Sequence, residues 1–435
     1  MRVRTSLRIA LGIALGLAGG AWAQEGGFPD VAPKAGWDTL PPAKAAEGDW
    51  PWWRGPNRDN LAPAGQKPPV AWGAGSNILW QVRLPGLGHS SPCLVGDRIY
   101  VTSGDLAQGA VWLFCLERDT GKTVWQAEVY KGPVAKQHAD NSLASATPAC
   151  DGERVFVPYQ SDQAVGMVAV GLDGKVLWSK TVLPYKTIQG YSASPTFYKS
   201  ALIVPIEGSG GSRMVALHRA TGEVVWRTTL RTVKESYASA LVARVAGRDQ
   251  LLLIGGESTR GYDPENGALL WECEGPSTYC GATPVVGAGV VYATAGWPKR
   301  ALLAIRADGT GDVTKSHVAW SSDAKAGYVP SPVLREGLLY AVNDQGLMRC
   351  YDAADGKVLW EQDFQVPVYS SPTVAGDKVY VFDRKGKGYV LPTGRTAGAV
   401  ATSELPSGVF ATPVILGGRI YLRTLGDFYC IGEKR

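Results

Sequence analysis

The feature that most constrains the fold of this chain is a theme that recurs between Pro92 and Pro413. Each copy has a Ser-Pro or Thr-Pro step, a β-branched and aliphatic run, a small turn, a second such run, and then Gly followed by Trp. The copies are anchored, at intervals of 56, 47, 45, 44, 48, 40 and 41 residues, at Pro92, Pro148, Pro195, Ser239-Ala240, Pro284, Pro332, Pro372 and Pro413. Strand-like runs that recur roughly every 40 to 50 residues are typical of propeller blades of four strands.

The eight anchors predict an all-β fold, an eight-bladed β-propeller of four-stranded antiparallel blades. A second series supports this number, since one Trp accompanies nearly every copy: Trp80, Trp125, Trp178, Trp226, Trp271, Trp320 and Trp360. Trp80 precedes the first anchor, so we expect the N-terminal strand around Asn77 to Leu84 to complete the last blade and close the ring. Closure leaves no open sheet edge. A seven-bladed ring stays open as an alternative, because the segment from Thr393 has no Trp.

Residues 1–23 are predicted to be a secretory signal peptide. Arg2, Arg4 and Arg8 precede a short apolar run, and Ala21-Trp22-Ala23 comes before Gln24. No Cys follows the small residues, so a lipid anchor is not indicated, and the run is short for a membrane span. We therefore expect an exported protein, periplasmic or extracellular, with a Pro/Gly-rich N-terminal lead-in over 24–76 and the propeller over 77–435.

The charge of the chain argues against nucleic acid or an anionic membrane surface as a partner. The formal net charge is +5, and removing the three Arg of the predicted signal leaves about +2. The seven Cys do not form a disulfide framework, and we expect most of them to be small buried packing residues. Cys273 and Cys280 flank one loop, so a local disulfide between them stays open.

No catalytic motif emerges from the sequence. The four His residues, which are His89, His138, His218 and His317, show no pair at metal-ligand spacing, so we predict no metal site. The glycine stretch from Glu207 lacks the third Gly of a dinucleotide motif, because Arg213 stands there.

The geometry of a propeller nevertheless predicts a place for a ligand. The loops between blades and the loops joining the second strand of a blade to the third lie on one face, around the central channel. These loops carry ring-bearing and polar side chains, which would line a funnel with apolar walls and a few polar groups. The predicted ligand-binding residues are His89, Tyr191, Tyr237, Tyr279, Trp297, Tyr328, Asn343, Tyr369, Asp383, Arg384 and Phe410. The alternative is that these residues only close the channel by packing.

Two repeats resemble a known motif. Cys115 to Trp125 and Ala216 to Trp226 are similar to the tryptophan-docking motif of pyrroloquinoline-quinone propellers, with Glu117 and His218 at the position where the motif has Asp. The segments beginning at Asp49 (DWPWWRGPNRDN), Gly88 (GHSSP) and Gly309 (GTGDVTKSHVAW) look like signatures of secreted bacterial quinone-like propeller repeat proteins.

The resemblance implies two functions of different class. Quinoprotein dehydrogenases hold pyrroloquinoline quinone and Ca²⁺ in the funnel below a pair of adjacent Cys, and this chain has no two adjacent Cys. The chain also resembles the propeller scaffold of the outer-membrane β-barrel assembly machinery, which has the repeat without the cofactor. We therefore expect a non-catalytic binding or scaffold module, monomeric and without quinone or calcium, that binds a protein, peptide or glycan on its funnel face. A quinoprotein dehydrogenase-like enzyme is the alternative.

Overall fold

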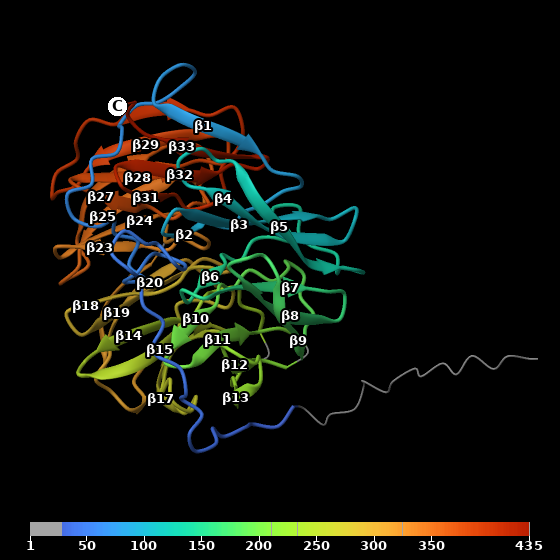
Figure 1. The fold of residues 1–435 in the computed structure, drawn as a ribbon. Helices are drawn as coiled ribbons and strands as arrows, with labels where there is room; N and C mark the ends of the chain where they lie inside the picture. Colours follow the sequence, from blue (N-terminus) through green and yellow to red (C-terminus); the bar gives the residue numbers. More distant parts are fainter. Residues whose placement is uncertain (1–27, 210, 233, 324, 435) are drawn as a thin grey trace, which may run out of the picture.

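The computed structural model describes residues 28–209, 211–232, 234–323 and 325–434. Within them every regular element is a β-strand, and the strands form eight sheets arranged in a ring (Figure 1). The eight-bladed propeller expected from the anchors is confirmed, and the seven-bladed alternative is wrong. The predicted signal peptide, 1–23, lies outside the described residues. No described segment forms a helix with the length and apolarity that crossing a bilayer requires.

The first four blades each begin directly after an anchor, and their strands follow one another from the channel outward. Blade 1 contains β2 (Cys93–Val95), β3 (Arg98–Asp105), β4 (Ala110–Glu117) and β5 (Thr123–Lys131). Blade 2 contains β6 (Ala149–Cys150), β7 (Arg154–Gln160), β8 (Ala164–Gly171) and β9 (Val176–Pro184). Blade 3 contains β10 (Thr196–Tyr198), β11 (Ala201–Ile206), β12 (Arg213–His218) and β13 (Val224–Thr229). Blade 4 contains β14 (Leu241–Val245), β15 (Arg248–Gly255), β16 (Ser258–Tyr262) and β17 (Leu269–Glu274).

The remaining blades follow the same order, except that the outer strand of the last blade comes from the N-terminal side. Blade 5 contains β18 (Val285–Gly287), β19 (Val290–Ala295), β20 (Ala301–Arg306) and β22 (Val318–Asp323). Blade 6 contains β23 (Val333–Arg335), β24 (Leu338–Val342), β25 (Leu347–Asp352) and β26 (Val358–Asp363). Blade 7 contains β27 (Thr373–Ala375), β28 (Lys378–Phe382), β29 (Lys387–Pro392) and β30 (Ala401–Glu404). Blade 8 contains β31 (Val414–Leu416), β32 (Arg419–Arg423), β33 (Asp427–Ile431) and β1 (Ile78–Arg83).

The ring closes by pairing of the two ends of the propeller. Strand β1 runs antiparallel to β33, with Trp80 opposite Cys430 and Val82 opposite Phe428. The expected N-terminal closure strand is therefore confirmed. Because β33 gains a partner strand on its outer side, the last blade is as complete as the others.

The Trp residues of the outer strands link most blades to the next. The indole N–H of Trp125 donates to the carbonyl of Leu172, and that of Trp178 donates to the carbonyl of Arg219, at 2.9 and 3.0 Å. Each accepting carbonyl lies in the turn between the third and fourth strands of the following blade. A Cβ atom at Gly174 in the first of these turns would lie only 2.9 Å from the Trp125 ring. Glycine is therefore needed where the ring packs on the turn.

Blade 4 departs from this pattern. The connection between β20 and β22 is long and contributes β21 (Gly311–Asp312), which pairs in parallel with β17 as a fifth strand. The tight glycine turn that the outer Trp meets in blades 2 and 3 is absent between β20 and β22, and the indole N–H of Trp271 donates instead to Gln250 Oε1 in its own blade, at 2.6 Å. The signature from Gly309 thus extends blade 4 and carries no funnel residue.

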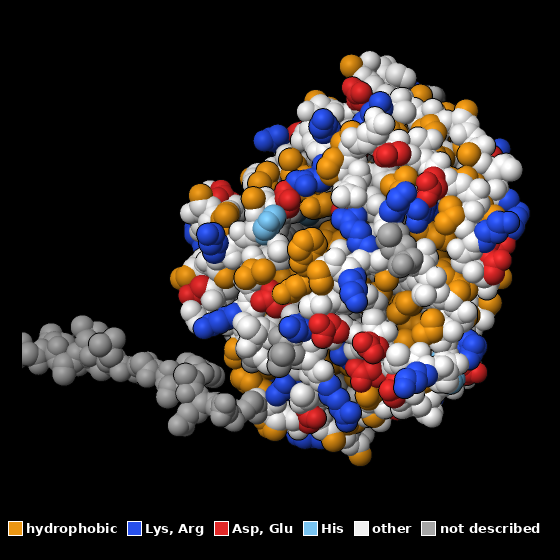
Figure 2. Space-filling model, turned by 180° about the vertical axis from the view of Figure 1, so that it is seen from behind, with side chains coloured by type: hydrophobic (Ala, Val, Ile, Leu, Met, Phe, Trp, Pro, Cys, Tyr) orange, Lys and Arg blue, Asp and Glu red, His pale blue; other side chains and the backbone are white. Residues whose placement is uncertain are grey.

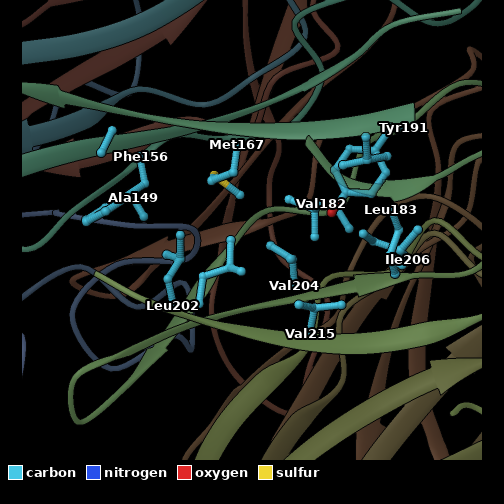
Figure 3. Close-up of a cluster of buried hydrophobic side chains, with 14 of the residues drawn as sticks. Ala149, Phe156, Met167, Val182, Leu183, Tyr191, Leu202, Val204, Ile206 and Val215 are labelled. Carbon is cyan, nitrogen blue, oxygen red and sulfur yellow. The ribbon is translucent and has the colours of Figure 1, made fainter. Parts of the chain in front are cut away.

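The hydrophobic core lies between neighbouring sheets. Figure 3 shows one such layer, where Phe156 and Met167 of blade 2 face Leu202, Val204 and Val215 of blade 3. All five side chains are buried. Burial of an aliphatic side chain of this size stabilises the fold by about 1.5 to 3 kcal/mol relative to exposure. Stability is therefore spread over eight such interfaces, as expected for a repeat protein.

The seven Cys are all buried thiols with no disulfide among them. Cys273 and Cys280, for which a local disulfide stayed open, are not bonded to each other. Cys280 Sγ lies 3.5 Å from the carbonyl of Ser277, and burial raises the pKa of both thiols above the ordinary value. They behave as packing residues.

The lead-in crosses the face of the ring opposite the predicted funnel, where the turns between the first and second strands lie. In Figure 1 this blue segment runs across the ring from the green blades to the red ones. Trp50 forms an antiparallel bridge with Leu94 of blade 1, Trp52 packs edge-on against Phe197 of blade 3, and Leu61 forms a bridge with Val374 of blade 7. Its conformation is thus fixed by contacts to several blades, and it is not a solvated linker.

Candidate functional site

The inter-blade loops and the loops between second and third strands surround a cavity of about 500 Å³ at the central channel. Figure 2 shows hydrophobic side chains gathered in the middle of one face of the ring, with charged side chains around them. Of the predicted site residues, seven line this cavity: His89, Tyr237, Tyr279, Trp297, Tyr328, Tyr369 and Phe410. A cavity of this size with aromatic walls and a few polar groups is typical of a ligand site.

Backbone pairing between adjacent loops holds the aromatic wall in place. The N–H of Tyr237 donates to the carbonyl of Cys280 at 2.8 Å, and the N–H of Tyr279 donates to the carbonyl of Trp297 at 2.9 Å. The Tyr237 ring is buried within the wall, whereas the Trp297 side chain is 60% exposed at the rim. The rim also carries Ile188, which is 67% exposed. The wall is therefore rigid, while its upper edge offers accessible apolar surface.

Three predicted site residues lie outside the cavity lining and have structural contacts instead. Tyr191 is buried, and its hydroxyl donates to the carbonyl of Pro205. Asn343 and Asp383 occupy the same position in blades 6 and 7. In each, one side-chain oxygen accepts two backbone N–H groups of its own loop, at 2.8 to 3.0 Å. These two residues shape the loops that border the funnel.

Arg384 is not itself part of the lining but contacts residues that are. Its guanidinium lies 4.5 Å from the ring centre of Tyr369 and 4.7 Å from that of Phe410. The Phe410 ring stacks in turn on His89, with ring centres 4.3 Å apart and planes inclined by 9°. The guanidinium also forms an ion pair with Asp140. Together these side chains form a compact cationic and aromatic cluster on one side of the funnel.

The sequence did not identify several lining residues, among them Trp53, His138, Asp140, Ile188, Gln189 and Arg300. Asp140 belongs to the loop between β5 and β6, which is 17 residues long, whereas nine residues separate β26 from β27. The sequence feature that indicates this long loop is the first interval between anchors, which at 56 residues is the longest. Arg300 is held by an ion pair with Asp344 at 2.7 Å, and this contact between two loops could not be derived from the repeat.

A girdle of hydroxyls surrounds the channel. It consists of the Ser or Thr before each anchor position, which are Ser91, Thr147, Ser194, Ser239, Thr283, Ser331, Ser371 and Thr412. At six steps around the ring the N–H of one member donates to the hydroxyl of the member in the next blade, at 2.8 to 3.1 Å. The Ser-Pro and Thr-Pro steps of the sequence therefore join neighbouring blades at the channel wall.

Positive charge dominates the side of the funnel near His89. Burial, aided by the charges of Arg423 and Arg384, lowers the pKa of His89 to about 4, so its ring is neutral near pH 7. Arg423 is fully buried, and its pKa is lowered to about 10 by burial. Nη2 of Arg423 donates to Ser103 Oγ at 3.1 Å, while its Nε and Nη1 have no hydrogen-bond partner among the described residues.

The donor groups of the funnel do not fit a calcium ion with its quinone. Ca²⁺ takes about six to eight oxygen ligands, whereas Asp140 and Asp344, the carboxylates that line the cavity, are each ion-paired with Arg. No group of three His, Cys, Asp or Glu side chains in the described part of the chain could hold a metal ion. Cys273 and Cys280 do not supply a disulfide that could cover a quinone ring.

Comparison with known proteins gives relatives of two kinds. The outer membrane protein assembly factor BamB of Burkholderia pseudomallei is 26% identical over 344 residues, which are 78% of this chain and 71% of that protein. A polyvinylalcohol dehydrogenase of Pseudomonas sp is 27% identical over 166 residues, which are 35% of this chain and 24% of that enzyme. The match thus spans about a quarter of the enzyme's length.

The solved structures and the family models agree on the fold. The crystal structure of a quinohemoprotein alcohol dehydrogenase from Comamonas testosteroni superposes with a TM-score of 0.65 at 12% identity, covering 90% of this chain and 82% of that one. At this identity the likeness shows the fold alone. The family model described as outer membrane protein assembly factor BamB matches residues 63–190, 210–313 and 308–424. Because these segments span most of the propeller, the chain belongs to this family of propeller repeat proteins, as its tryptophan motifs predicted.

Proposed function

We propose that this protein is an exported, non-catalytic propeller that binds a segment of a partner protein in its funnel. The proposal rests on the aromatic cavity of the funnel, at whose rim the side chains of Trp297 and Ile188 are 60% and 67% exposed. Apolar side chains exposed together beside a concave site mark a binding surface. Large aromatic side chains held in a rigid wall supply much of the binding energy in such sites.

Family membership supports a protein as the ligand. The family and one relative carry the name of an assembly factor for outer membrane proteins, and a protein that assists assembly must contact other proteins. Export is supported by the predicted signal peptide in the sequence. The mixture of Tyr rings, paired charges and amide groups in the cavity suits a peptide, whose backbone needs hydrogen bonds and whose side chains need apolar contacts.

The proposal assigns no chemistry to the funnel. Its two carboxylates are engaged with Arg300 and Arg384, and the His89 ring is neutral and stacked on Phe410. These groups are arranged as a recognition surface, without a nucleophile beside a base. The partial match to polyvinylalcohol dehydrogenase keeps a quinone-dependent enzyme as the second candidate.

Removal of two cavity tyrosines tests the proposed function. In a Tyr237→Ala/Tyr369→Ala double variant the wall loses both rings, and capture of partner proteins from an extract of the native cells should fall to background. Tyr198→Ala is the matched control, because Tyr198 lies at the opposite face, where its hydroxyl contacts Asp249 at 3.3 Å. The melting temperature of each variant is measured first.

Capture that is equal for the double variant and for the Tyr198→Ala control would contradict the proposal and place the binding surface outside the funnel. Capture that is abolished only by glycosidase treatment of the extract would identify a glycan as the ligand and contradict a protein segment.

A further inference from the structure

The loop between β5 and β6 reaches over the funnel from blade 2 to blade 7. Its Asp140 forms an ion pair with Arg384 and accepts a hydrogen bond of 3.4 Å from the Tyr369 hydroxyl. Both partners belong to blade 7, whereas the loop enters blade 2 at Ala149. This loop therefore places a carboxylate of its own among the aromatic side chains of the cavity.

The loop is fixed directly after Asp140, so this residue is presented in a defined position. The Asn141 side-chain amide donates to the carbonyl of Gln189 at 2.6 Å. The carbonyl of Ala144 accepts the N–H groups of His89 and Ser90, at 3.0 Å each. The loop is thus tied to the wall on the carboxyl side of Asp140, and the Asp140 side chain projects to Arg384.

A second cation lies near this place, and its guanidinium has donors without acceptors. Arg384 has Asp140 as its partner, but Arg423 is buried nearby with Nε and Nη1 unpartnered in the described residues. Both guanidinium groups contribute to the lowered pKa of His89, which shows that their positive charge acts at the same point. Because buried donors without an acceptor are costly, a further acceptor such as a carboxylate is favoured here.

The ion pair that Asp140 forms is accessible to a competitor. The side chains of Arg384 and Asp140 are 26% and 31% exposed, so water reaches both. A partly exposed ion pair contributes little to stability and can be exchanged for another carboxylate. The rings of Tyr369 and Phe410, which lie beside Arg384 with their centres 5.5 Å apart, would contact an apolar side chain next to that carboxylate.

We propose that Asp140 is a built-in stand-in for a ligand carboxylate, and that the funnel recognises a protein segment carrying a carboxylate beside an aromatic or aliphatic side chain. The segment's carboxylate takes the place of Asp140 on Arg384, and the Asp140 side chain turns away. This inference rests on the proposed function, because it names the chemistry of the ligand that the same cavity binds.

Selection from random dodecapeptides tests the inference on the full mature chain. Two libraries are used, one with free C-termini and one joined to the carrier at both ends. The same selection is run on the Tyr237→Ala/Tyr369→Ala variant to identify peptides that bind in the funnel. Asp or Glu should be enriched beside an apolar residue in both libraries if a side chain supplies the carboxylate, and enrichment confined to free C-termini would identify the terminal carboxylate instead.

Affinities of one enriched peptide and its carboxamide analogue then test the role of each residue. The wild type should prefer the acid by about tenfold or more, as charge-assisted hydrogen bonds do. Arg384→Gln should bring this ratio to about one. Asp140→Asn should bind the acid about two- to fivefold more tightly, since no ion pair has to be broken. Asp119→Asn is the matched control, because Asp119 pairs with Arg419 at the opposite face, and it should change neither value.

The outcomes separate this inference from the proposed function. Peptides that bind in the funnel without an acidic preference, or acid binding that Asp140→Asn leaves unchanged in strength, would overturn the stand-in role while the binding function remains. Failure to enrich any peptide that the double tyrosine variant loses would overturn both. The melting temperature of each variant shows whether that variant is folded. Asp140→Asn is expected to gain affinity, which a misfolded protein could not do.

Discussion

The indole N–H of Trp53 donates a hydrogen bond of 2.9 Å to Thr283 Oγ1. Trp53 belongs to the N-terminal lead-in, and Thr283 belongs to the girdle of hydroxyls around the channel. Trp53 lines the same cavity as the funnel aromatics, although it approaches from the opposite face. The lead-in thus reaches into the channel from the end opposite the rim that carries Trp297.

The lead-in should contribute to stability and resist proteolysis. Trp52 is 4% exposed and packs against Phe197, so Trp52→Ala should lower the free energy of unfolding by about 3 to 5 kcal/mol, in the range of large-to-small core substitutions. Denaturant titration measures this change. In the wild type, trypsin should cleave slowly after Arg54, whose guanidinium donates to the carbonyl of Pro332. Rapid cleavage between Asp49 and Arg58 would mean that the segment is detached in solution.

The closure strand offers a second test of stability. The ring of Trp80 stacks on Phe428 at 5.8 Å, and its indole N–H donates to the carbonyl of Arg118. Because Trp80 is half-buried, Trp80→Ala should cost about 3 kcal/mol, at the low end of values for Trp truncation. Trp297→Ala removes an equally large ring that is mostly exposed and should leave the melting temperature nearly unchanged. An equal shift for both variants would show that β1 does not close the ring in solution.

Glu207 should make the stability of the protein depend on pH. Its carboxyl is buried between blades 3 and 4, and burial raises its pKa to about 7 despite Arg260, whose Nη1 lies 3.8 Å away. In the unfolded chain this carboxyl has a pKa near 4.5, so the folded protein binds its proton more tightly than the unfolded chain does. Stability is therefore lost as pH rises from about 4.5 to 7, by about 3 kcal/mol for the full shift.

Substitution of Glu207 by its neutral isostere tests the direction of this pH dependence. Glu207→Gln cannot ionise, so its stability relative to the wild type should rise between pH 5 and pH 8. Thermal unfolding of the two proteins at both pH values measures the difference. A constant difference across this range would show that Glu207 does not titrate in the folded state.

The enzyme alternative makes a separate prediction. The mature protein incubated with pyrroloquinoline quinone and Ca²⁺ should give no binding heat in calorimetry and no dye-linked oxidation of alcohols, because the carboxylates of the funnel are already paired with Arg. Micromolar binding together with Ca²⁺-dependent turnover would favour a quinoprotein dehydrogenase over a non-catalytic binding protein.

The repeat in the sequence was sufficient to predict the ring, because each blade is a local unit that contacts mainly its neighbours. The proline anchors mark the first strands, and the Trp before the first anchor indicates closure with the last blade. Six funnel residues could be found for the same reason, since they lie three to five residues before an anchor, and Trp297 could be found because it lies in the loop between β19 and β20.

The site features that the sequence did not predict depend on contacts between segments far apart in the chain. Nothing in the repeat indicates that Asp140 reaches Arg384 or that Trp53 enters the channel from the other face. Tyr191 lies three residues before the girdle Ser194, whereas Tyr237 lies two before Ser239, so Ser192 takes the lining position in that loop. The Tyr191 ring packs edge-on against Tyr185 instead, with ring centres 5.6 Å apart. A shift of one residue in an inter-blade loop is therefore enough to turn a ring away from the cavity.

Photo-crosslinking in the native cells tests most directly whether the funnel is the binding surface. Benzoylphenylalanine is placed at Trp297, on the rim of the funnel, and in a second protein at Val224, which is 40% exposed on the outer strand of blade 3. The account predicts a discrete protein adduct from position 297 that disappears in the Tyr237→Ala/Tyr369→Ala background, and no such adduct from position 224. An adduct from position 224 alone, or one from position 297 that persists in the double variant, would contradict it.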